Sequence, residues 1–151
     1  MEQVTTSVQS TAQSLNDLIK RGYRFSVPRY QRLYVWEDEQ VSTLVADLLT
    51  ASEAPRQPYF LGGILVVRNK HQSELLDLID GQQRLTTLWL MSVALGQELA
   101  DFTTCNGQPR LVFSIRATAN AYFRTKAGLD TDTVPNPGQT ADSGLERITR
   151  A

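Results

Sequence analysis

A short apolar run that stops at a polar junction, with a second apolar run directly after it, constrains this chain most. Leu75–Ile79 has the character of a β-strand, Asp80-Gly81 ends it, and the segment that follows is typical of a helix. A helix that begins directly after a strand presents unpaired backbone N–H groups, and its dipole favours negative charge there. Gly81 permits a tight turn and close approach of a phosphate, while Arg84 can form paired hydrogen bonds to phosphate oxygens. The junction predicts an anion site; the alternative is an ordinary helix start that Asp80 caps, with Arg84 in solvent.

The bulk properties indicate a globular domain and show no obvious targeting signal or membrane span. With 151 residues, 41% of them hydrophobic, the chain is long enough for one domain with a tail. A net charge of −1 provides no overall attraction to nucleic acid or anionic membranes. The single cysteine, Cys105, excludes an internal disulfide and suits a reducing compartment, so we expect a cytoplasmic protein. The polar first 14 residues do not resemble a signal peptide, and no apolar run approaches the roughly 20 residues of a membrane span.

Hydrophobic periodicity divides the chain into two flexible ends and one mixed α/β domain. We expect a flexible N-terminus at 1–13, a domain at 14–127 and, at 128–151, a flexible linker or the start of a further region. The segment after Asp80 is apolar on most faces, which predicts a central buried helix. Predicted helices cover about 14–21, 37–50, 82–100 and 117–126, and predicted strands cover 23–27, 59–68, 74–79 and 111–115. The strand at 59–68 should be buried and form a hairpin with 74–79.

The segment 25–36, FSVPRYQRLYVW, is the second unusual feature. Five cations and no acid lie between Lys20 and Arg32, and aromatic residues alternate with them. Cations beside aromatic faces can hold phosphates and stack a base. In the alternative interpretation, the aromatics are core anchors and the arginines are solvated. Gln31 and Arg32 lie beside a turn that Pro28 restricts, where a functional loop is expected.

The pair Gly62-Gly63 is the third feature, because glycine weakens a strand and often marks close approach of a backbone or ligand. A bulge or a tightly packed helix is the alternative. Several standard sites are absent from the sequence. There is no GxxxxGK[ST] phosphate loop. One histidine and one cysteine exclude a zinc site made of these residues alone, and likewise an HNH nuclease centre.

Read in order, VPRYQRLYVW, an amphipathic helix, YFLGGILV and IDGQQRLTTL resemble the N-terminal domain of GmrSD-type restriction proteins. That group is similar to the wider ParB/sulfiredoxin-like superfamily. The resemblance covers about residues 15–124. It implies a small mixed α/β domain with a short, mostly antiparallel sheet and a central buried helix after the DGQQR turn.

The resemblance also implies a nucleotide site. The DGQQR turn would bind the phosphates of a nucleoside triphosphate and support its hydrolysis with Mg²⁺. The residues carried over are Asp80 (also the metal ligand), Gly81, Gln82, Gln83 and Arg84, with Gln31, Arg32 and Gly62 lining the same pocket. Either glutamine of the turn would orient the attacking water.

Proteins of this kind act in defence against phage DNA, and their nuclease is a separate HNH domain or subunit. We therefore expect this chain to be an N-terminal piece or to act with a partner chain, with DNA reached through the larger assembly. Two alternatives stay open. The domain could itself be a metal-dependent nuclease, with Asp77 or Glu74 assisting Asp80, or it could be a non-catalytic DNA-binding module that uses the basic segment 20–32.

Overall fold

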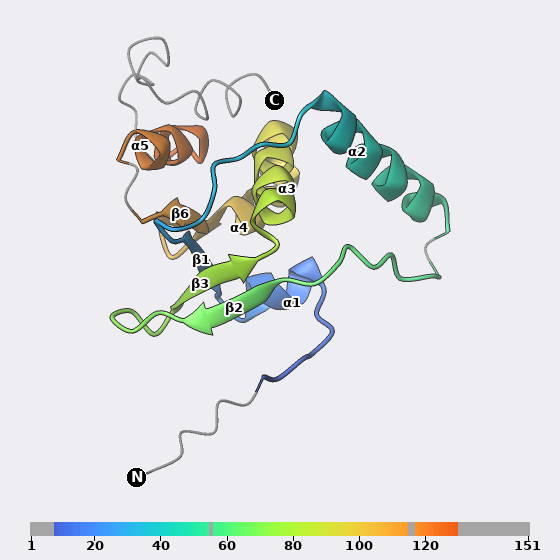
Figure 1. Ribbon diagram of the computed structural model, residues 1–151. Helices are drawn as coiled ribbons and strands as arrows, with labels where there is room; N and C mark the ends of the chain where they lie inside the picture. Colours follow the sequence, from blue (N-terminus) through green and yellow to red (C-terminus); the bar gives the residue numbers. More distant parts are fainter. Residues whose placement is uncertain (1–7, 55, 115–116, 130–151) are drawn as a thin grey trace.

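Four short strands form the central sheet of the computed structural model, which describes residues 8–54, 56–114 and 117–129 (Figure 1). They are β1 (Arg24–Val27), β2 (Leu65–Arg68), β3 (Leu75–Asp80) and β6 (Leu111–Phe113), in the order β2-β3-β1-β6. β1 pairs in parallel with β3 and β6, while β2 and β3 form the expected antiparallel hairpin. A second, two-stranded hairpin consists of β4 (Thr104–Cys105) and β5 (Gln108–Pro109). The mixed α/β class is confirmed, with more parallel pairing in the main sheet than expected.

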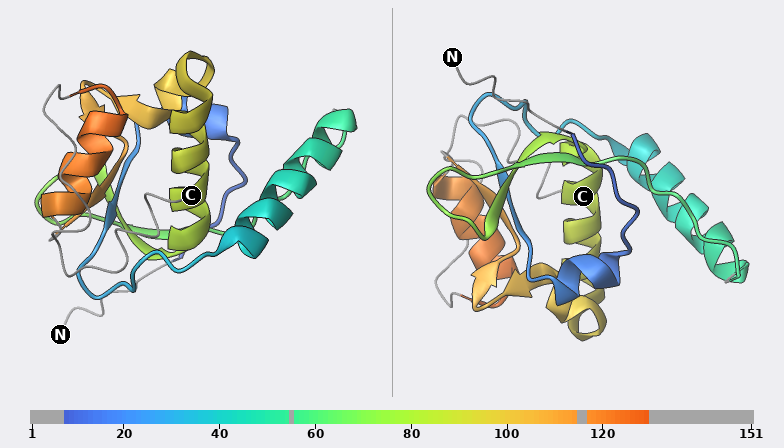
Figure 2. Two further views of the ribbon diagram at one scale, coloured as in Figure 1. Left: turned by 90° about the horizontal axis from the view of Figure 1, so that it is seen from above. Right: turned by 90° about the horizontal axis from the view of Figure 1, so that it is seen from below.

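The helix that follows β3 lies at the centre of the domain. Figure 2 shows α3 (Gln82–Leu95) between α5 (Ala117–Lys126) and α2 (Asp38–Glu53), and α2 extends away from the other elements. Leu44 is the only buried residue of α2. The two remaining α-helices are α1 (Leu15–Lys20) and α4 (Ala100–Thr103). Trp89 of α3 and Phe123 of α5 are both buried, with ring centroids 4.5 Å apart, so the central helix is anchored by aromatic packing.

Two predicted elements are clearly longer than the elements that the structure contains. The predicted buried strand at 59–68 is a strand only over β2, and most of its residues are exposed, because β2 lies at the edge of the sheet with one neighbour. The predicted long helix 82–100 ends at Leu95. Gly96, with φ of +71°, interrupts it, and a 3-10 turn (Gly96–Leu99) leads into α4. The predicted bounds of α5 and the Ser14–Asp17 capping box are confirmed.

Parts of the predicted end regions lie outside the described residues, namely 1–7 and 130–151, so the domain limits stay a prediction. No helix in the described part of the chain has the length and apolar character needed to cross a membrane.

A buried arginine, Arg110, connects α1, the residue before β1, and α4 through hydrogen bonds to backbone carbonyls. Arg110 is 2% exposed, and burial lowers the pKa of its guanidinium. It has no carboxylate partner among the described residues, and backbone carbonyls surround it instead. Its side chain donates to the carbonyl oxygens of Leu18, Tyr23, Asp101, Phe102 and Thr104. The sequence contains no signal for this cage, because carbonyl groups of distant elements build it.

Candidate functional site

The left-handed conformation of one glycine creates the junction between β3 and α3. Gly81 is the N-cap of α3 with φ of +86°, and no side chain caps the helix. Asp80 accepts a hydrogen bond from the Gly81 N–H at 2.8 Å through Oδ1, so its carboxylate lies before the first turn. The alternative in which Asp80 caps α3 is therefore wrong. The first turn keeps N–H groups available to an anion.

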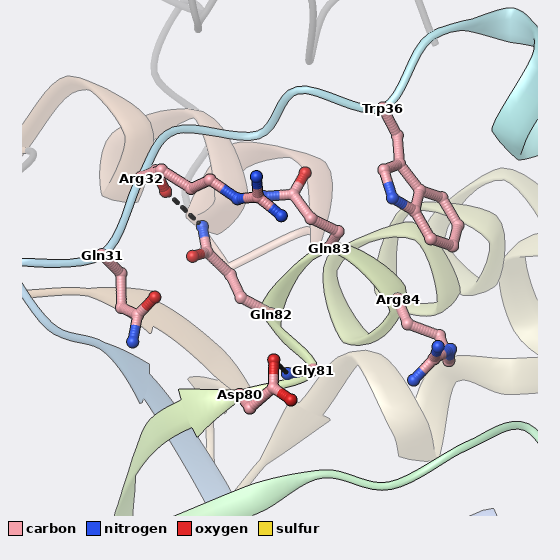
Figure 3. Close-up of a pocket in the computed structure, with 8 residues that line it drawn as sticks. All are labelled: Gln31, Arg32, Trp36, Asp80, Gly81, Gln82, Gln83 and Arg84. Atoms are coloured by element: carbon pink, nitrogen blue, oxygen red, sulfur yellow. Dashed lines mark hydrogen bonds between the residues drawn. The ribbon is translucent and has the colours of Figure 1, made fainter.

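A pocket of about 190 Å³ lies at this junction (Figure 3). Its lining residues come from the segment before α2 and from the DGQQR turn. They are Gln31, Arg32, Trp36, Asp80, Gly81, Gln82, Gln83 and Arg84. The structure thus brings together all the predicted site residues except Gly62, which contacts Arg84 from outside the pocket. The pocket also includes Trp36, which was not among the predicted site residues.

The two glutamines of the turn have different environments, although their sequence positions are adjacent. Gln83 is buried, and both ends of its amide are engaged: Nε2 donates to the Leu33 carbonyl at 2.9 Å, and Oε1 accepts from the Val35 N–H at 2.7 Å. Gln82 is 5% exposed and donates from Nε2 to the Arg32 carbonyl at 2.8 Å. Its Oε1 is buried and has no partner within the described part of the chain. A buried acceptor without a donor is costly, and such an atom calls for an explanation, for example a bound water.

Gln31 is the third glutamine whose side-chain amide donates to a backbone carbonyl of the facing segment. Its Nε2 donates to the Ile79 carbonyl at 2.9 Å and, less closely, to the Leu78 carbonyl at 3.3 Å. Together the three glutamine side chains hold the segment 31–35 against the β3–α3 junction. A buried hydrogen bond of 2.8 Å between Tyr34 Oη and Thr87 Oγ1 adds a fourth tie. The two segments that line the pocket, 31–36 and the DGQQR turn, are therefore held together by hydrogen bonds.

Arg84 lies against the glycine pair of the segment before β2. Its Nη1 donates to the Gly63 carbonyl at 3.4 Å, and no carboxylate of the described residues pairs with it. Gly62, with φ of +110°, leaves the space that the guanidinium occupies. The close neighbour at Gly62 is this side chain of α3 rather than a backbone or a ligand, and the glycine pair lies before β2 rather than within a strand. Arg84 thus retains donors that an anion can use.

The acidic residues near the pocket are few. Asp80 is exposed, and its Oδ2 has no partner within the part of the chain that the structure describes. Asp77 accepts hydrogen bonds from Asn69 Nδ2 at 3.0 Å through both carboxylate oxygens. Among the described residues, no group of three His, Cys, Asp or Glu side chains could hold a metal ion. One carboxylate beside bound phosphates is nevertheless enough for Mg²⁺, which keeps several waters.

The aromatic residues of the segment 25–36 divide into two groups. Phe25 and Tyr34 are 3% and 1% exposed, so the core-anchor interpretation is confirmed for them. Trp36 is half-buried and lines the pocket, whereas Tyr30 is 67% exposed. Arg32 is exposed beside the pocket, although its own carbonyl is the acceptor for Gln82.

Comparison with known proteins identifies the family of this chain. No curated protein matches the chain. A family model described as the GmrSD restriction endonuclease, N-terminal domain, matches residues 14–144, which is most of the chain and includes every lining residue of the pocket. The chain therefore belongs to the family of GmrSD restriction endonuclease N-terminal domains.

Proposed function

We propose that this chain binds and hydrolyses a nucleoside triphosphate at the β3–α3 junction, as one part of a restriction endonuclease system. Membership of the family supplies the restriction endonuclease system. The nucleotide is our proposal. One observation carries it: a single pocket is lined by the uncapped start of α3, by an arginine without a carboxylate partner among the described residues, and by Gln82, whose buried Oε1 has no partner there. Such a pocket offers donors for phosphate and an acceptor for water.

The phosphates would lie between the first turn of α3 and the Arg84 guanidinium. The N–H groups at the start of the helix point out of its end, where the helix dipole favours an anion. Arg84 forms one long hydrogen bond to the Gly63 carbonyl, so most of its donors are available. The guanidinium carries a full positive charge, which makes its bonds to phosphate oxygens stronger than neutral ones.

We assign the orientation of the attacking water to Gln82 rather than to Gln83. Its Nε2 is engaged by the Arg32 carbonyl, and its buried Oε1 has no partner among the described residues, so this oxygen is an unused acceptor for a water that enters from the pocket. A water that donates to Oε1 would direct its lone pair at the terminal phosphorus. The new P–O bond forms as the bond to the bridging oxygen breaks, and inorganic phosphate leaves. Gln83 cannot act in this way without giving up its bonds to Leu33 and Val35.

Asp80 is the residue that would hold Mg²⁺, through Oδ2 and through waters. The ion, when bound, neutralises charge on the phosphate oxygens. Hydrolysis would then gate a nuclease in an HNH-type domain or partner subunit, which would act on DNA. We place this system in the cytoplasm, where the buried free thiol of Cys105 would stay reduced.

Isothermal titration with ATP, GTP, CTP and UTP, each with and without Mg²⁺, tests the proposal. Arg84→Met should weaken binding at least about tenfold and leave the thermal unfolding curve unchanged. Arg68→Met is the matched control, because Arg68 is exposed and also donates from Nη1 to one carbonyl at 3.4 Å. If the Arg84 variant still hydrolyses nucleotide at the wild-type rate, the proposal is wrong.

A further inference from the structure

We propose that a second cavity, between α2 and the segment at 59–61, receives the base and sugar of the nucleotide whose phosphates bind at the β3–α3 junction. This inference rests on the proposed function and deepens it, since it assigns the nucleoside a place of its own. The cavity measures about 320 Å³. It shares two lining residues, Trp36 and Arg84, with the pocket at the junction.

The small size of the first pocket favours such an extension. Sites for small molecules commonly measure about 300–1,000 Å³, whereas the pocket at the junction measures about 190 Å³. A pocket of this size suits a chain of phosphates, and the adjoining cavity provides space for a base and a sugar. Arg84 lines both cavities, so a ligand anchored on its guanidinium extends from one into the other. Figure 3 shows the indole of Trp36 on the same side of the pocket as Arg84.

The lining of the second cavity suits a nucleoside. Trp36 and Tyr59 are aromatic residues on which a base can stack, and Leu44 and Leu61 add apolar surface. Stacking accepts any base, because every base has a π-face. The cavity therefore favours a nucleoside without selecting its base.

Asp47 provides the polar contact that a sugar needs. Its Oδ2 accepts a hydrogen bond from Tyr59 Oη at 2.9 Å, which ties α2 to the segment 59–61. The other carboxylate oxygen has no partner among the described residues, so it can accept from a sugar hydroxyl. The same bond raises the pKa of the Tyr59 phenol, which keeps it a donor to Asp47. A carboxylate near the sugar disfavours phosphate at this end of the ligand, which fixes the direction in which the nucleotide binds.

The packing of α2 leaves this space open. Only Leu44 of its sixteen residues is buried, and Figure 2 shows the helix extending away from α3. Its link to the segment 59–61 is a hydrogen bond between two exposed side chains rather than a packed core. A ligand can enter between these two elements without displacing buried side chains.

Binding of three probes to the full chain tests the inference: inorganic triphosphate, a ribonucleoside triphosphate and its 2′,3′-dideoxy analogue. Inorganic triphosphate reports the pocket at the junction alone. We expect the ribonucleotide to bind about tenfold more tightly than inorganic triphosphate, and the dideoxy analogue, which keeps the base but lacks the sugar hydroxyls, to have an affinity between the two. Tyr59→Ala and Asp47→Ala should remove most of this advantage and change inorganic triphosphate binding less than about twofold.

Each varied residue has a matched control in the same segment of the chain. Phe60→Ala removes an aromatic ring that is 81% exposed and outside the cavity. Asp38→Ala removes an exposed carboxylate from the same helix, again outside the cavity. Both should leave all three affinities unchanged. Tyr59 and Asp47 are themselves exposed, so their variants should fold.

The outcomes separate the two proposals. If all three probes bind equally to the wild type, the nucleoside subsite is wrong while the phosphate site stands. The subsite is also wrong if the Tyr59 and Asp47 variants lose inorganic triphosphate and ribonucleotide to the same extent. If neither inorganic triphosphate nor nucleotide binds, the proposed function fails, and the subsite fails with it.

Discussion

The guanidinium of Arg84 occupies the space that a side chain at Gly62 would need. A Cβ at Gly62 would lie 2.6 Å from Arg84 Nη1 and 2.7 Å from Cζ. The φ of +110° at Gly62 is also one that other residues rarely adopt. The glycine thus fixes where the arginine lies, and with it where an anion would bind.

Gly62→Ala should therefore displace Arg84 and weaken nucleotide binding. The strained backbone should also lower the free energy of unfolding by about 1–3 kcal/mol. Gly63→Ala is the matched control, since a Cβ there meets no atom within 4 Å. Titration calorimetry and urea unfolding of both variants measure the two effects. Equal nucleotide affinity in the two variants would contradict this role of Gly62.

Gln82→Leu should mainly lower the rate of nucleotide hydrolysis, whereas Gln83→Leu should mainly lower the free energy of unfolding. The Gln83 variant leaves the Leu33 carbonyl and the Val35 N–H without their partner, so the free energy of unfolding should fall by about 2 kcal/mol. The Gln82 variant loses one hydrogen bond and an unpartnered acceptor, so its stability should change by less than about 1 kcal/mol. Its rate of nucleotide hydrolysis should nevertheless fall at least about tenfold.

Chemical unfolding and a phosphate-release assay on both glutamine variants decide between the residues. A Gln82 variant with wild-type hydrolysis would show that Oε1 does not orient the water. A Gln83 variant that is as stable as the wild type would show that the segment 33–35 does not depend on this amide.

Arg110→Met should destabilise the chain strongly, by about 3 kcal/mol or more, because five backbone carbonyls lose a charged donor. Arg110→Lys should recover only part of this, since an ammonium cannot reach the same set of acceptors. The exposed Arg68→Met variant should stay within about 0.5 kcal/mol of the wild type. Urea unfolding monitored by circular dichroism is the measurement, and a stable Arg110→Met variant would contradict the role of the cage.

Stability should fall at alkaline pH through two buried phenols. Burial raises the pKa of Tyr34 and of Tyr122 above the ordinary value of 10.0. The folded state therefore favours the neutral phenol. Its contribution is fully present below the unfolded pKa and is lost as the pH rises through the higher folded pKa.

Tyr122→Phe should make the free energy of unfolding less steep in pH above about 10. Tyr34→Phe should do the same, and it should also cost about 1 kcal/mol at neutral pH because the bond to Thr87 is lost. Urea unfolding at a series of pH values measures both slopes. An unchanged slope in both variants would contradict the assignment.

Local signals predicted the elements that local chemistry controls. Ser14 and Asp17 form the capping box that their spacing indicates, and α5 has the predicted bounds. The predicted strand at 59–68 was too long, and the prediction that it is buried was wrong, because exposure at a sheet edge depends on which strand lies beside it. The predicted helix at 82–100 was too long. The apolar pattern continues past Gly96, but the backbone leaves the helical conformation at that glycine.

The sequence by itself predicted the order of a strand, a glycine turn, a helix start and an arginine in Leu75–Arg84, which is the arrangement on which the proposed anion site rests. It also marked the pair Gly62-Gly63 as a place where a backbone, a ligand or a packed helix could be the close neighbour. Only the tertiary structure decided that this neighbour is Arg84, that Gln83 is fully engaged while Gln82 Oε1 is free, and that Trp36 joins two cavities. The reason is physical: these facts depend on which backbone groups of distant segments come within hydrogen-bonding distance, and spacing along one segment carries no information about that.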